Sequence, residues 1–85
     1  MKVSGSVIQN RFIEINTDKE FVATYKGHII NINSDHGLGK PKFDHLTRFS
    51  IIVFGKDGGY AVDSYQDFHE IKDAIRYALN GACLL

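Results

Sequence analysis

Residues 64–81 read SYQDFHEIKDAIRYALNG, and this stretch decides the fold because its apolar residues repeat at helical spacing. The apolar positions are Phe68, Ile71, Ala74, Ile75, Ala78 and Leu79, which share one face of a helix. Ser64 predicts the N-cap, and Asn80-Gly81 predicts the end, with Gly81 free to adopt a left-handed conformation. We therefore expect a helix over about residues 65–80 whose apolar face is buried, because so short a helix is marginal alone.

The strongest strand pattern before this helix is a hairpin over residues 21–32. The runs FVATY and HIINI alternate in polarity, and Lys26-Gly27 separates them as a two-residue turn. With that turn Tyr25 lies opposite His28, and the more apolar set of side chains faces one side. The alternation and the turn agree, which favours this pairing.

Residues 48–63 predict a second hairpin, with a glycine-rich turn between two apolar runs. A three-residue turn places Phe54 opposite Tyr60 and Ile52 opposite Val62. A two-residue turn shifts both pairs, and the sequence leaves the two registers open.

Weaker strands are expected over residues 3–8 and 11–16. The order of strands followed by one helix predicts an α+β fold, with an antiparallel sheet of four to six strands and the C-terminal helix across one face. We expect residues 1–85 to form a single domain.

Composition excludes several classes of function. Ten basic and ten acidic residues cancel, which argues against non-specific nucleic-acid binding and against an acidic mimic of DNA. The single cysteine, Cys83, permits no intramolecular disulfide, and we expect a buried structural thiol in a reducing compartment. The chain shows no secretory signal and no apolar run of membrane-spanning length, so we expect a cytoplasmic protein without membrane association.

Residues 34–47 form a long segment without clear periodicity, and long loops are often functional. Asp35-His36 and Asp44-His45 offer imidazole and carboxylate groups that could bind a divalent ion. Their spacing matches no closed metal motif, and we expect neither a metal nor another cofactor. A small-ligand or metal-binding domain using this loop is one alternative function.

A second alternative is a nucleic-acid-binding domain that uses a local basic patch of Lys40, Lys42 and Arg48. The neutral net charge disfavours it. No nucleophile elbow or zinc-protease motif is present, and we expect no enzymatic activity.

Tyrosines provide the remaining signal. Tyr60, Tyr65 and Tyr77 are those that could be exposed, and surface tyrosines are typical anchors of protein interfaces. The alternative is that their rings pack at the edge of the core with wet hydroxyls. The leading hypothesis is a small non-enzymatic protein-binding module, such as an inhibitor, antitoxin or accessory factor of the bacterial or phage type.

Residues 57–60, Asp-Gly-Gly-Tyr, are followed by a short strand and a helix, and this unit resembles the hairpin–helix unit of HicB-type antitoxins. The resemblance covers about residues 49–80. Val62-Asp63-Ser64 stands where those antitoxins have Leu-Pro-Gly. The resemblance implies an antitoxin-like role but does not assign the family.

Residues 48–54, RFSIIVF, are apolar on both faces, although one helix covers only one face of a sheet of this size. We expect a homodimer that buries the second face or joins edge strands. Alternatively, the loop over 34–47 closes this face, or a different protein docks on it.

Overall fold

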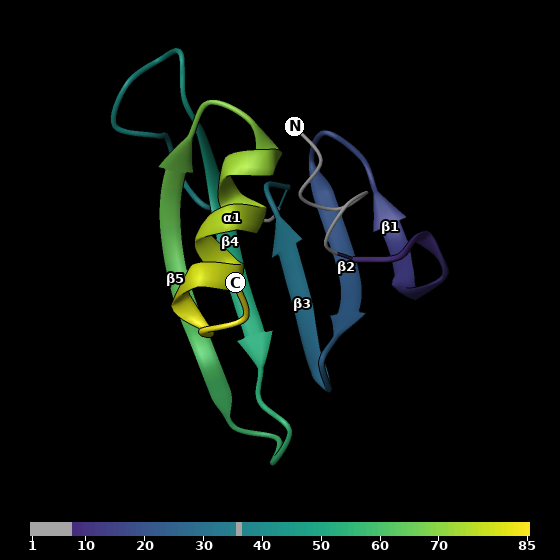
Figure 1. Cartoon of the computed structure of the whole chain (residues 1–85). Helices are drawn as coiled ribbons and strands as arrows, with labels where there is room; N and C mark the ends of the chain where they lie inside the picture. The colour runs from purple at the N-terminus through teal and green to yellow at the C-terminus, as the bar shows by residue number, and fades with distance from the viewer. Residues whose placement is uncertain (1–7, 36) are drawn as a thin grey trace.

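The computed structural model describes residues 8–35 and 37–85. Within these residues, an antiparallel sheet of five strands in the order β1-β2-β3-β4-β5 carries one α-helix, α1, across one face, so the predicted α+β fold is confirmed (Figure 1). The elements are η2 (Asn10–Phe12, a 3-10 helix), β1 (Ile13–Asn16), β2 (Glu20–Tyr25), β3 (His28–Asn33), β4 (Thr47–Phe54), β5 (Tyr60–Phe68) and α1 (Ile71–Gly81). The expected strand over 3–8 lies outside the described residues except for Ile8, which is buried.

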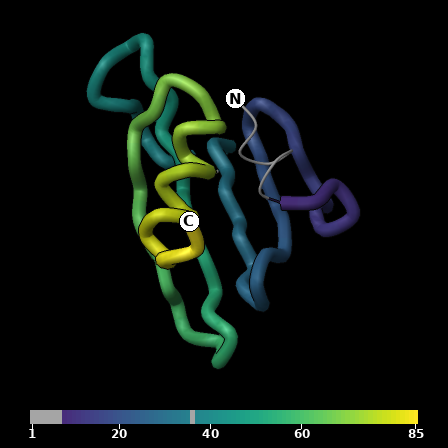
Figure 2. Tube along the Cα trace, viewed as in Figure 1, coloured from purple at the N-terminus to yellow at the C-terminus, as the bar shows by residue number. Residues whose placement is uncertain are grey.

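The β2–β3 hairpin has the predicted turn and register. Lys26 and Gly27 have φ values of 50° and 79°, and positive φ at both central residues is the geometry of a type I′ turn. Tyr25 lies opposite His28, as expected. Each later strand lies beside the one before it, so the chain runs as a meander that can be followed in Figure 2.

The β4–β5 hairpin does not keep one register along its whole length, so neither the three-residue nor the two-residue turn predicts all of its pairs. Phe54 lies opposite Tyr60, as the three-residue turn predicts, but Val62 lies opposite Val53 and not opposite Ile52. A bulge inserts one extra residue into β5 between these pairs. The bulge turns the Val62 side chain toward the buried face, where Val53 also lies.

The predicted start of the helix is wrong: α1 begins at Ile71, and Ser64 is not its N-cap. Residues 64–68 instead continue β5, whose last residue, Phe68, lies opposite Thr47 of β4. The ladder with β4 gives partners to backbone groups along this whole segment. Tertiary pairing therefore overrides the local capping signal.

The predicted end of the helix is also corrected. Gly81 is the last residue of α1, and the left-handed residue is Cys83, with φ 58°. The N–H of Cys83 donates to the carbonyl of Asn80 at 3.1 Å, and the N–H of Leu84 donates to that of Leu79 at 2.8 Å. These two bonds form a Schellman motif. Cys83 is exposed, so the expectation of a buried thiol is wrong.

The core lies between α1 and the sheet face that it covers. Its buried apolar residues are Ile8, Phe21, Ala23, Ile30, Ile32, Phe49, Ile51, Val53, Val62, Ala74, Ile75, Ala78, Leu79 and Leu84. Ile75 and Leu79 are buried, as expected, and Ile71 is half-buried against this cluster. No helix among the described residues is long and apolar enough to cross a membrane.

Candidate functional site

The sheet face opposite α1, called the outer face below, carries a line of exposed apolar side chains. Strand residues alternate between faces, so the neighbours of buried Ile30 and Val53 project outward. The pairing aligns Ile29 with Phe54, and Phe54 with Tyr60, across three strands. Ile29 and Tyr60 are 48% and 64% exposed, and the rings of Phe54 and Tyr60 lie 5.2 Å apart.

Further outward side chains extend this line along β4 and β5. Ile52 is half-buried and lies opposite Asp63, while Tyr65 is 67% exposed and lies opposite Ser50. The outer-face patch is defined here as Ile29, Ile52, Phe54, Tyr60 and Tyr65. No described element packs over this patch, and its character is aromatic and apolar, with the Asp63 carboxylate beside it.

The predicted tyrosine anchors separate into two environments. Tyr60 and Tyr65 share the outer face, whereas Tyr77 belongs to α1 on the other side of the sheet. The Tyr77 hydroxyl donates to the Ser64 hydroxyl at 3.3 Å and accepts from the Gln66 amide at 3.2 Å. Tyr77 therefore holds α1 to β5 through polar groups on the core side.

Two members of the predicted basic patch meet at one carboxylate. Arg48 Nε donates to Asp67 Oδ1 at 2.8 Å, and the backbone N–H of Lys42 donates to Asp67 Oδ2 at 2.7 Å. The Lys42 ammonium lies 5.8 Å from the ring centre of Phe43, and Lys40 is exposed. The Arg48 charge is therefore already paired within the chain. No local pattern in the sequence indicates this pair, because Asp67 falls within the predicted helix.

Asp67 lies in an environment that favours its charged form. The hydrogen bond from Arg48, followed by the backbone bond from Lys42, lowers the pKa of the Asp67 carboxyl below its ordinary value of 3.8. The same hydrogen bond raises the pKa of Arg48. The pair anchors the end of the loop over residues 34–46 to β5.

A lowered native pKa predicts a specific acid sensitivity. The stabilisation from ionised Asp67 is fully present above the ordinary pKa of 3.8 that this group has in the unfolded chain, and it is lost as the pH falls through the lower native pKa. We expect Asp67→Asn to flatten the loss of stability in this acid range, as measured by urea unfolding at several pH values. Asp57→Asn, in the exposed β4–β5 turn, is the control. Equal acid dependence in both variants and the parent would contradict the assignment.

The predicted metal ligands do not form a described metal site. Asp35 lies 3.9 Å from the Lys19 ammonium, and His45 lies near His69 with ring centres 6.2 Å apart. Asp44 is exposed, and His36 lies outside the described residues. Across residues 8–35 and 37–85, no three histidine, cysteine or acidic side chains gather as a metal-binding group.

The described residues of the loop, 34–35 and 37–46, do not cover the apolar end of the outer face. They project past the end of the sheet where β4 begins and β5 ends (Figure 1). Ile29, Phe54 and Tyr60 lie at the opposite end, next to the two hairpin turns. Phe43 of the loop is 53% exposed and stacks on His45. The hypothesis that this loop closes the second face is therefore wrong for that end of the sheet.

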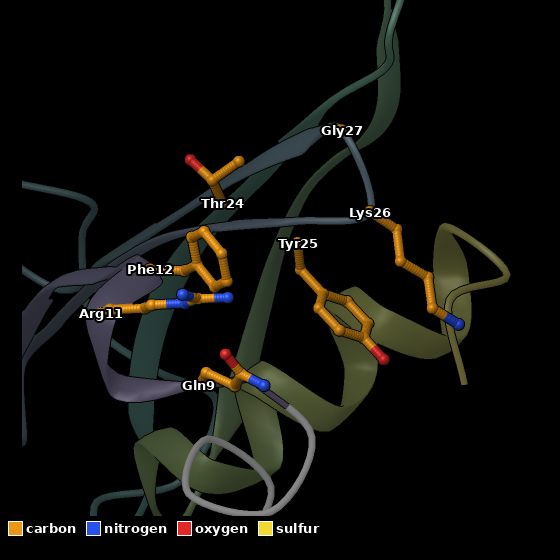
Figure 3. A pocket seen from close by; sticks show the side chains of 7 residues that line it. All are labelled: Gln9, Arg11, Phe12, Thr24, Tyr25, Lys26 and Gly27. Carbon is orange, nitrogen blue, oxygen red and sulfur yellow. The ribbon is translucent and has the colours of Figure 1, made fainter.

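A hollow of about 360 Å³ lies where η2 passes the end of β2 (Figure 3). Its lining residues are Gln9, Arg11, Phe12, Thr24, Tyr25, Lys26 and Gly27. The Arg11 guanidinium lies 4.7 Å from the ring centre of Phe12, and the Lys26 ammonium lies 5.2 Å from that of Tyr25. Sequence reasoning missed this hollow because it depends on how η2 meets β2. None of the described loop residues, 34–35 and 37–46, lines this hollow.

Comparisons with protein-family models, with curated proteins and with solved structures found no match for this chain. The fold alone does not imply a function, so the function is argued from the geometry of the surfaces described above.

Proposed function

We propose that this chain is a non-enzymatic protein-binding module that docks another protein on the outer-face patch. The observation that carries the proposal is the line of Ile29, Phe54 and Tyr60 across three strands, with Tyr65 exposed further along β5. The proposed class is an inhibitor, antitoxin or accessory factor of the bacterial or phage type.

The chemistry of the patch favours a protein over a small ligand. Aromatic side chains on an exposed sheet provide a large contact area, whereas small-ligand sites are concave and enclose their ligand. Asp63 lies near Tyr65 on β5 and makes no ion pair within the described part of the chain. The complementary partner surface is therefore apolar, with a lysine or arginine placed to meet Asp63.

The proposal includes a homodimer in a reducing compartment, such as the cytoplasm. Cys83 is exposed and has no second cysteine in the chain, and reducing conditions keep such a thiol free. The zero formal net charge removes one barrier to self-association.

The test is affinity capture from a lysate of the source organism with the parent chain and with Tyr60→Ala. Tyr60 is exposed, so its removal leaves the core intact. We expect the captured protein to bind Tyr60→Ala at least roughly 30-fold more weakly, as for an interface hot spot worth about 2 kcal/mol. Thermal unfolding of the variant should match the parent.

Lys72→Ala is the matched control, because Lys72 is exposed on α1, behind the sheet. It should capture the same protein with unchanged affinity. Capture that is indifferent to Tyr60→Ala contradicts the proposal. Capture of nucleic acid that is lost on changing Lys40 and Lys42 supports the nucleic-acid alternative instead.

A further inference from the structure

β5 forms one edge of the sheet and is its longest strand. It spans Tyr60–Phe68, nine residues, and no described strand pairs with its free side. A long open edge presents backbone donors and acceptors that can pair with another strand. β1, at the other edge, has only four residues.

The alternation of antiparallel bonding identifies which groups of β5 are open. Tyr25 and His28 flank a two-residue turn and therefore exchange both backbone bonds. In each strand, backbone groups of successive residues point alternately to one neighbouring strand and to the other. When this alternation is followed from the turn pair through β3 and β4, the backbone groups of Ser64 and Gln66 bond to β4. The N–H and C=O groups of Asp63 and Tyr65 then point to the free side.

We propose that two copies of the chain join antiparallel along their β5 edges, with Ser64 on the twofold axis. Ser64 is the middle residue of Tyr60–Phe68, so this register pairs the strand with its copy over its full length. Asp63 of one copy lies opposite Tyr65 of the other, and their open backbone groups bond to each other. The two sheets become one continuous sheet.

Charge selects this register over its neighbours. A twofold axis at Asp63 places that carboxylate opposite its own copy. An axis at Tyr65 places Asp63 opposite Asp67 of the other copy. Like charges directly opposite each other destabilise a strand pair, whereas the axis at Ser64 opposes no two carboxylates.

The helices support the same arrangement. α1 packs on β5 and β4, so the twofold axis brings the two copies of α1 to the same side of the joined sheet, next to the seam. A second copy therefore meets this edge through backbone bonding, with both copies of α1 beside the seam.

This inference rests on the proposed homodimer and not on docking of another protein. Sedimentation equilibrium of the parent chain is expected to show twice the mass of one chain. Tyr65→Pro removes an outward N–H without removing a bond to β4, and edge strands tolerate such a proline. We expect it to weaken dimerisation at least about tenfold while leaving the fold intact by circular dichroism. Tyr65→Ala, which keeps the N–H, should remain dimeric.

Disulfide trapping tests the register. In a Cys83→Gly background, Ser64→Cys places two thiols in a directly opposed pair without backbone bonds, where Cα atoms lie about 4.5 Å apart. Mild oxidation is expected to link most of this variant as a dimer. Asp63→Cys should remain largely unlinked, because in this register each residue 63 lies opposite residue 65 of the other copy and not opposite residue 63.

The outcomes separate the two proposals. A monomeric parent chain overturns the dimer and this inference, while the capture experiment with Tyr60→Ala still decides the docking function. A dimer that persists in Tyr65→Pro, or that fails to link through position 64, overturns the β5 seam and favours a face-to-face dimer.

Discussion

Leu79→Ala is expected to lower the free energy of unfolding by about 2–5 kcal/mol. Leu79 is fully buried, and it belongs to the cluster in which α1 packs on the sheet. Truncation removes apolar contact and leaves a cavity, which the surrounding side chains fill only in part. Urea unfolding measures the loss, and an unchanged m-value would show that the variant unfolds from the same compact state.

Leu85→Ala is the matched control because it makes the same chemical change at a leucine that is 60% exposed. It is expected to change stability by less than about 0.5 kcal/mol. If Leu79→Ala also cost less than that, the buried face of α1 would be assigned wrongly.

The second large effect is expected from Gly81→Ala. A Cβ at this position lies only 2.9 Å from Cγ2 of Val62, a buried side chain of β5. Alanine favours a helix over glycine by up to about 1 kcal/mol, whereas overpacking a core costs about 1–3 kcal/mol. We therefore expect a net loss of about 1–2 kcal/mol by urea unfolding.

A double-mutant cycle isolates the contact behind this loss. Val62→Ala removes the methyl groups that the new Cβ meets. In that background, Gly81→Ala is expected to be neutral or to stabilise by up to about 1 kcal/mol, because only the helix preference remains. An equal loss in both backgrounds would place the cost in the backbone and not in the contact with Val62.

The hairpin over residues 21–32 could be predicted from the sequence because its signals are local. The turn residues and the alternation of FVATY and HIINI specify the same register, and no distant residue is needed. The fold class followed from the same kind of signal, strands first and a helical period last.

The true extent of β5 could not be predicted in this way. Its core-facing residues include Ser64 and Gln66, which break the apolar alternation of a strand. The Gln66 amide donates to the Ser64 hydroxyl at 2.7 Å, and both groups also bond to the Tyr77 hydroxyl of α1, which lies far away in the sequence. A local reading therefore assigns them to a helix start.

The sequence also could not predict that Tyr60 and Tyr65 lie on the same face of the sheet. The two residues are five positions apart, and strict alternation places them on opposite faces of a strand. The bulge between Tyr60 and Val62 adds one residue and returns both rings to the outer face. The outer-face patch thus depends on a bulge in β5, and the number of residues in the turn does not by itself predict that bulge.

The meander order of the sheet has a consequence for how the chain folds during synthesis. Every described strand pairs with its neighbour in sequence, so the sheet can assemble by adding one strand at a time as the chain emerges. The sheet face that α1 covers stays exposed to solvent until residues 71–81 have been synthesised, because that helix follows all five described strands. The nascent sheet therefore exposes Phe21, Phe49 and Ile51 to other chains, and docking of α1 is the step that ends its vulnerability to aggregation.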